Sequence, residues 1–261
     1  TSNQIEISLG EDKVIVRDDG GFSNSDNKIM RVQFNSGDSQ IYNIKFGVSG
    51  NANSFTYDGE TDIYYGNKSR ARDTLNVASE LSNVSIWLND KNYDTKEYDG
   101  IGVINASSVA DTKLTLAGSA DNNVIYAGGN NTATSLWGGG GEANTLVGGA
   151  GEETFFYFKD IGYTDSDGNR HHSSDTFDRV SENDLIWLYD VKIDDIDYEK
   201  TQSGITNSKI SVFLTDGTEI SVTNMSTNTN FRILESVDDA TGAKTWKDVR
   251  AINSGNNRRW E

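Results

Sequence analysis

Short runs of alternating apolar and polar residues cover much of this chain, and they predict β-strands rather than helices. Residues 5–9 alternate in this way near the start. Further on, the alternating segments 30–34 and 42–46 flank a polar turn sequence at 35–38. This arrangement predicts a β-hairpin within a strand-rich segment that leads into the rest of the chain.

A short apolar unit then repeats along the middle of the chain. Its step is mostly about 9 to 12 residues, too short for helical repeats of about 33 residues or more. A longer step, between residues 86 and 104, holds a charged insertion around 91–98. Stacked strand-and-turn units bury a ladder of like side chains, so the members from Leu116 to Phe155 are expected in one continuous core. The recurring residues are Tyr64, Leu75, Ile86, Ile104, Leu116, Ile125, Leu136, Leu146 and Phe155.

The sharpest local signal is the glycine-rich run at 138–151. Residues 148–156, Gly-Gly-Ala-Gly-Glu-Glu-Thr-Phe-Phe, resemble the nonapeptide G-G-x-G-x-D-x-U-x of RTX calcium-binding proteins, with Glu for Asp. Residues 139–147 match less closely, with Glu142 in a glycine slot and Asn for Asp. Glycine suits such turns, which need positive φ and a close approach of the backbone to an ion or the next coil. The resemblance covers about 55–190.

The resemblance implies a parallel β-solenoid or β-roll from the repeat region of a large bacterial surface adhesin. In that family, the residue two positions before each large apolar residue binds Ca²⁺ between coils, together with carbonyls of the glycine turns. The corresponding residues here are Asn123, Thr134, Asn144 and Glu153, of which only the last is acidic. Hydrogen bonds from Asn and Thr are therefore an alternative to metal in these turns.

Further acidic residues extend the set of candidate calcium ligands. Asp175 lies two residues before Phe177, and Asp165 and Asp167 begin a loop that resembles half of an EF-hand. That loop has Thr176 where an EF-hand has its twelfth-position glutamate. Carboxylate and amide oxygens are nevertheless ligands that Ca²⁺ accepts, so a few calcium sites are expected. The candidate ligands are Asp165, Asp167, Asp175, Asn144 and Glu153.

The last part of the chain predicts a cap. Apolar residues alternate over 210–214 and 220–222 on either side of an Asp-Gly turn, which is a strong hairpin signal. The expected all-β organisation is thus a β lead-in at 1–54, an RTX-like β-solenoid at 55–190 and a C-terminal β-hairpin cap at 191–261.

Composition narrows the functional classes. Forty acidic and 23 basic residues give the 261-residue chain a net charge of −17, which argues against nucleic acid or an anionic membrane as a partner. The sequence has no transmembrane run and no cysteine, so neither membrane insertion nor thiolate chemistry is expected. Proline is also absent, as suits a chain that is largely strand.

Catalytic motifs are not found. His171 and His172 lie together in a polar loop, and no G-x-S-x-G or H-E-x-x-H sequence occurs. Trp87 and Trp187 occupy similar strings, Ile-Trp-Leu-Asn-Asp and Ile-Trp-Leu-Tyr-Asp. Stacking along the solenoid is the favoured interpretation of these tryptophans, and a carbohydrate platform is the alternative.

The sequence therefore predicts a non-enzymatic, extracellular structural or adhesion module of a bacterial cell surface. Its expected partner is a host or surface ligand, either protein or glycan, or further copies of itself. Two alternatives stay open. One is a carbohydrate-active β-helix enzyme with converging carboxylates, and the other is the secretion and stability domain of an exported enzyme.

Overall fold

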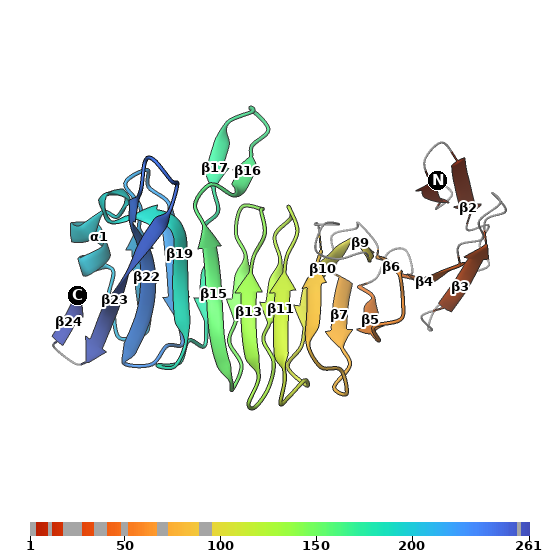
Figure 1. Cartoon of the computed structure of the whole chain (residues 1–261), viewed down its shortest axis with the longest axis horizontal. Helices are drawn as coiled ribbons and strands as arrows, with labels where there is room; N and C mark the ends of the chain where they lie inside the picture. Colours follow the sequence, from red (N-terminus) through yellow and green to blue (C-terminus); the bar gives the residue numbers. More distant parts are fainter. Residues whose placement is uncertain are drawn as a thin grey trace.

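The structure, a computed structural model, describes residues 4–9, 12–17, 28–33, 41–47, 52–66, 73–88, 96–254 and 257–261. Nearly all regular structure in these ranges is β-strand, which confirms the all-β prediction. The exceptions are a 3-10 turn, η1 (Ile193–Asp195), and one short helix, α1 (Tyr198–Ser203). Strands lie side by side along the long axis, and α1 lies near the C-terminal end (Figure 1).

Two eight-stranded sheets make up most of the molecule. Neighbouring strands are parallel from β5 to β21 in the first sheet and from β8 to β22 in the second. The first sheet contains β5 (Ser54–Tyr57), β7 (Asp73–Val77), β10 (Ile101–Asn105), β12 (Val124–Tyr126), β14 (Thr145–Val147), β18 (Thr176–Asp178), β21 (Glu219–Thr223) and β20 (Lys209–Phe213). The second contains β8 (Val84–Trp87), β11 (Lys113–Ala117), β13 (Ala133–Trp137), β15 (Glu152–Phe158), β19 (Leu185–Lys192), β22 (Asn228–Val237), β23 (Lys244–Ser254) and β24 (Asn257–Trp260).

The chain alternates between these sheets. From β10 to β15, each strand in the first sheet is followed directly by one in the second, so one circuit of the chain adds one strand to each sheet. Ile104, Ile125 and Leu146 lie directly beside one another, 21 residues apart. The recurring residues of the sequence therefore form two ladders, one per sheet, with successive members falling in alternate ladders.

Both ladders meet in one core. Every member is fully buried and belongs to a single hydrophobic cluster. The prediction that Leu116, Ile125, Leu136, Leu146 and Phe155 share a core is confirmed. The first ladder is Phe55, Leu75, Ile104, Ile125, Leu146, Phe177 and Val222, and the second is Ile86, Leu116, Leu136, Phe155, Ile186 and Phe231.

Tyr64 was expected in this series but belongs to another sheet. It lies in β6 (Ile63–Tyr65), where its register partners are Lys45 and Tyr98. Phe55 is the partner of Leu75 instead. Residue spacing alone cannot separate the two positions, because each places an apolar residue at a suitable distance from Leu75. The separate four-stranded sheet contains β3 (Lys28–Gln33), β4 (Ile41–Phe46), β6 and β9 (Glu97–Asp99).

Both predicted hairpins are present. Strands β3 and β4 pair antiparallel, although the turn at 35–38 lies outside the described residues, and β20 and β21 pair antiparallel. Strand β21 also continues the first sheet beside β18, and β22 continues the second beside β19. The expected boundary at 190–191 therefore falls inside β19. Two further antiparallel pairs join β1 (Gln4–Leu9) to β2 (Asp12–Arg17), and β16 (Gly162–Thr164) to β17 (Arg170–His172).

Candidate functional site

Polar side chains two residues before the ladder positions connect one circuit to the next. In the first sheet, the Asn123 N–H donates to Asn144 Oδ1 at 2.9 Å, and the Asn144 N–H donates to Asp175 Oδ1 at 3.1 Å. The Asn53 N–H donates to Asp73 Oδ1 at 2.6 Å in the same way. In each case the side-chain oxygen accepts from the equivalent residue of the preceding circuit, so these bonds form a polar ladder beside the apolar one.

The polar ladder includes positions at which the RTX resemblance predicted calcium ligands. Asn123, Asn144 and Asp175 are all buried. Asn144 Nδ2 also donates to the Gly140 carbonyl at 2.8 Å and to Asp175 Oδ1 at 2.9 Å. Burial raises the pKa of Asp175 to about 6, while the hydrogen bonds from Asn144 oppose the rise. In this sheet the Oδ1 atoms of Asn144 and Asp175 therefore accept hydrogen bonds from asparagine N–H groups.

The second sheet has a less complete arrangement. The Glu153 N–H donates to Asp184 Oδ1 at 2.9 Å, and Asp184 Oδ2 accepts from the Ser181 N–H at 2.6 Å. Glu153 is buried, but neither of its carboxylate oxygens receives a hydrogen bond of normal geometry. Burial, and then the Asp184 charge, raise the pKa of Glu153 to about 7, against a smaller opposing effect of the Gly149 backbone. Burial also raises the pKa of Asp184.

Asp165 and Asp167 lie away from both polar ladders, in the loop of the β16–β17 hairpin that projects from the stacked strands (Figure 1). Asp165 Oδ1 accepts from the N–H groups of Asp167 and Asn169, and Asp165 Oδ2 lies 2.7 Å from His171 Nε2. These contacts, His171 foremost, lower the pKa of Asp165 to about 2. The aspartate thus shapes its own loop, and His172 is paired separately, with Asp216 at 3.1 Å.

The five candidate calcium ligands fall into three places. Asn144 and Asp175 are in contact, Glu153 lies beside Asp184 in the other sheet, and Asp165 and Asp167 share the hairpin loop. Within the described part of the chain, no group of three or more His, Cys, Asp or Glu side chains is placed to hold a metal ion.

The glycines of the 148–151 run serve close packing. A Cβ on Gly149 would lie 1.7 Å from the Gly128 carbonyl oxygen, and one on Gly151 would lie 1.8 Å from the Thr132 carbonyl oxygen. Neither glycine has a positive φ, whereas Gly139 does, at +82°. The sequence predicted both positive φ and a close approach of the backbone in these glycine turns. Positive φ is found at Gly139, in the earlier turn, and the close approach to a neighbouring circuit is found at 148–151.

A different set of side chains forms a continuous aromatic row on the outer face of the second sheet. Each aromatic residue of this row directly follows a residue of the second ladder, and so points away from the core. Register places six residues in the row, in the order Trp87, Ala117, Trp137, Phe156, Trp187 and Arg232. Trp87 and Trp187 were noticed in the sequence, but Trp137 and Phe156 were missed. The signal that could have found them is an aromatic residue immediately after four of the six large apolar residues of the second ladder, Ile86, Leu136, Phe155 and Ile186.

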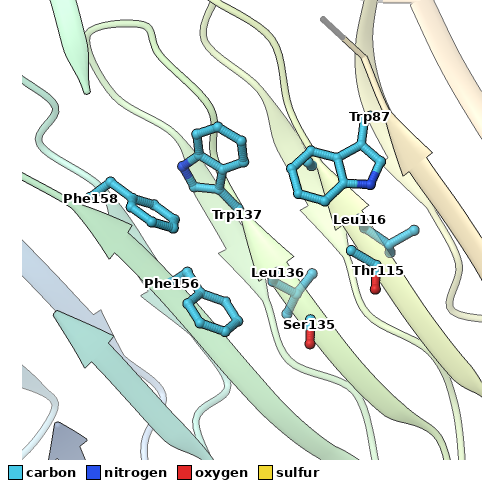
Figure 2. Close-up of a pocket in the computed structure, with 9 residues that line it drawn as sticks. Trp87, Thr115, Leu116, Ser135, Leu136, Trp137, Phe156 and Phe158 are labelled. Carbon is cyan, nitrogen blue, oxygen red and sulfur yellow. The ribbon is translucent and has the colours of Figure 1, made fainter. Parts of the chain in front are cut away.

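One end of the row is a cavity of about 400 Å³, called the aromatic groove here. The ring centroids of Trp87 and Trp137 lie 5.6 Å apart with their planes at 64°, and those of Trp137 and Phe158 lie 5.1 Å apart. Figure 2 shows the two indoles beside each other, with the Thr115 and Ser135 hydroxyls farther back along the strands. The groove is lined by Trp87, Thr115, Leu116, Ala117, Ser135, Leu136, Trp137, Phe156 and Phe158.

The other end of the row is covered by cations and the closing hairpin. Trp187 packs edge to face with Trp246 of β23, with centroids 5.3 Å apart. The Arg232 guanidinium lies 5.2 Å from the Trp187 ring, and Lys244 Nζ lies 4.5 Å from the Tyr189 ring. The stacking expected for Trp187 is thus present at this end, whereas none of the described residues that line the aromatic groove is charged.

The geometry gives little support to glycoside hydrolysis at the cavities. That chemistry needs two carboxyl groups across a cleft, one with a raised pKa. Among the described residues, no carboxylate lines the aromatic groove. A second cavity of about 360 Å³ is lined by Asp248 and Glu261. Arg232 pairs with Asp248 at 2.7 Å and lowers its pKa. The carboxyl groups with raised pKa, Glu153, Asp175 and Asp184, line neither of these two cavities.

No helix among the described residues is long and apolar enough to cross a membrane. No protein-family model, curated protein or solved structure matches this chain, so its function has to be inferred from its own geometry.

Proposed function

We propose that this chain is a non-enzymatic structural and adhesive module of an exported bacterial surface protein, folded as a β-roll of degenerate RTX repeats. The alternation of strands between two parallel sheets supports the roll, because each circuit holds two strand-and-turn units. The observation that carries the proposal is the polar ladder through Asn123, Asn144 and Asp175. It makes a circuit-to-circuit connection at the positions where RTX repeats place calcium.

The polar ladder explains how such a repeat can hold together with little metal. Rows of aspartates repel one another until a cation neutralises them. Asn123 and Asn144 carry no charge, and the Asn123 N–H and the Asn144 N–H and Nδ2 groups bond to neighbouring circuits instead. A buried N–H that keeps its acceptor avoids a desolvation cost of about 1–3 kcal/mol. The repeat is thus stabilised as a rigid support by hydrogen bonds, and we place it outside the cell on the strength of the RTX resemblance.

Calcium has one suitable place in this proposal, beside Glu153 and Asp184. Two buried carboxyl groups face each other there, and the Glu153 oxygens have no hydrogen-bond donor of normal geometry. Ca²⁺ favours charged oxygen ligands, so it would relieve the repulsion between these groups. Two carboxylates are fewer than the six to eight oxygen ligands that Ca²⁺ takes, so this would be a single weak site.

Circular dichroism with and without a strong chelator, at about pH 7.5, tests the proposal. We expect the β signal to persist after chelation, with a modest fall in Tm that reflects loss of one weak ligand. The variant Glu153→Gln serves as the matched control, since its Tm should no longer respond to calcium. Collapse of the β signal in the chelator would show that metal, and not the polar ladder, joins the circuits.

An activity assay addresses the enzymatic alternatives separately. The intact chain is expected to turn over neither oligosaccharides nor esters. Turnover that disappears when one described Asp or Glu is replaced would contradict the non-enzymatic assignment, whatever the result with the chelator.

A further inference from the structure

The aromatic groove is a built cavity rather than a flat apolar patch. Ala117 pairs with Trp87 on one side and with Trp137 on the other, so a small residue separates two large ones. Neighbouring strands lie about 4.8 Å apart, so the two tryptophan-bearing strands are separated by about 10 Å. The indoles of Trp87 and Trp137 meet above Ala117, which is 1% exposed, with their ring centroids 5.6 Å apart. The cavity that they border has a volume of about 400 Å³, in the range of small-ligand sites.

The groove combines aromatic faces with uncharged hydroxyl groups. The indoles of Trp87 and Trp137 meet at 64°, so they present two differently oriented surfaces. Thr115 and Ser135 line the same cavity. Ser85, which lies beside Thr115 in register, accepts a hydrogen bond from Trp87 Nε1 at 2.8 Å. None of the described residues that line the groove is charged, although the chain carries a net charge of −17.

We propose that the aromatic groove binds a neutral saccharide, an inference that rests on the adhesive role proposed above and gives it a ligand class. One face of a pyranose ring presents C–H groups that pack against the electron-rich face of an indole. Its hydroxyl groups can bond to Thr115 and Ser135. A purely apolar ligand would bury those two hydroxyls without partners, and an anionic ligand would approach a strongly negative protein.

A second copy of the chain fits the groove less well. Among the described residues, the large hydrophobic side chains that are exposed are Tyr126, Ile193, Tyr198 and Val237, and they lie singly on different elements. They form no projecting aromatic patch that would fill the cavity of another molecule. The described residues of the lining include no carboxylate, which also matches binding without hydrolysis.

Isothermal titration calorimetry of the whole chain tests the inference with four soluble hexasaccharides. Cellohexaose, maltohexaose and N-acetylchitohexaose are the neutral probes, and hexagalacturonate is the anionic one. We expect at least one neutral probe to bind and the anionic probe not to bind. Ala117→Leu, which forces apart the two indoles that meet above this position, and Trp137→Ala, which removes one wall, should each weaken binding about tenfold or more. Thr115→Val, which removes a hydroxyl at nearly constant shape, should weaken it by a smaller factor.

Trp246→Ala is the matched control, because this tryptophan belongs to the covered end of the row. Its ring contacts are with Trp187 and Tyr189, which are not among the residues that line the groove. It should bind the saccharide as the parent does. Failure of all three neutral probes to bind the folded chain would overturn the inference, as would equal binding by Ala117→Leu. Sedimentation that reveals a dimer lost in Ala117→Leu would overturn it in favour of a contact between copies. The chelation experiment is independent of these outcomes, so failure here leaves the proposed fold and structural role standing.

Discussion

Asp175 Oδ1 accepts a hydrogen bond from the backbone N–H of Asn144, 3.1 Å away in the neighbouring circuit. The bond joins β14 to β18 next to the place where Leu146 and Phe177 meet in the core. A single side chain thus satisfies a buried backbone donor and fixes the register of two strands 31 residues apart in sequence. This relationship makes the polar ladder testable by substitution.

Asp175→Ala should lower the free energy of unfolding by about 1–3 kcal/mol, because the buried Asn144 N–H and Nδ2 groups lose their acceptor. Asp175→Asn keeps an oxygen at the same place, so its effect should stay within about 1 kcal/mol. Urea denaturation measures both. Equal losses in the two variants would show that charge at this position, and not the hydrogen bond, is what matters.

The stability of the chain should fall as pH rises from about 5.5 to 8. The folded-state pKa of Glu153, about 7, lies above its ordinary value of 4.5. The folded chain therefore holds more protons than the unfolded chain in this window, and stability is lost as the pH passes the folded pKa. Asp175, with its pKa raised to about 6, acts in the same direction.

Urea denaturation at about pH 5.5 and at about pH 8 checks this prediction. A loss of about 1–3 kcal/mol is expected at the higher pH. The difference in stability between the two pH values should shrink in Glu153→Gln. It should persist in Glu152→Gln, because Glu152 is the exposed neighbour of Glu153 and its replacement removes the same ordinary charge. An unchanged pH dependence in Glu153→Gln would assign the effect to other groups.

Leu136→Ala should lower the free energy of unfolding by about 2–5 kcal/mol, since Leu136 is fully buried between Leu116 and Phe155. Tyr126→Ala is the control, because Tyr126 points outward from the first sheet and is 36% exposed. Chemical denaturation should show a much smaller loss for the control. Comparable losses would mean that the second ladder is not the stabilising core.

Gly149→Ala should destabilise the chain strongly, because the new Cβ would lie 1.7 Å from the Gly128 carbonyl oxygen of the adjoining backbone. Gly168→Ala is the contrasting change. Gly168 has φ +84° with open space around it, so the cost is the conformational strain alone, about 1 kcal/mol. A larger loss of Tm for Gly168→Ala than for Gly149→Ala would contradict the close approach of the two circuits.

The sequence by itself determined the local structure and the identity of the core residues. Alternation at 210–214 and 220–222 predicted the β20–β21 hairpin, and the recurring apolar residues from Leu75 to Phe155 are all buried. These features follow from period-two patterning and from turn residues, which act between near neighbours in the chain. The absence of cysteine likewise excluded disulfides and thiolate chemistry without reference to any fold, and the absence of proline suited a chain that is largely strand.

Only the tertiary structure decided which of these residues meet. Ladder membership depends on strand pairing 19 to 45 residues away, so spacing placed Tyr64 in the wrong series and could not separate the two ladders. The same pairing sets Ala117 between Trp87 and Trp137 and thereby lets the two indoles meet at the aromatic groove. It also assigns the Asn144 and Asp175 oxygens to N–H donors of neighbouring circuits. A side chain's partner across parallel strands is fixed by register, and register is set by how the whole core packs.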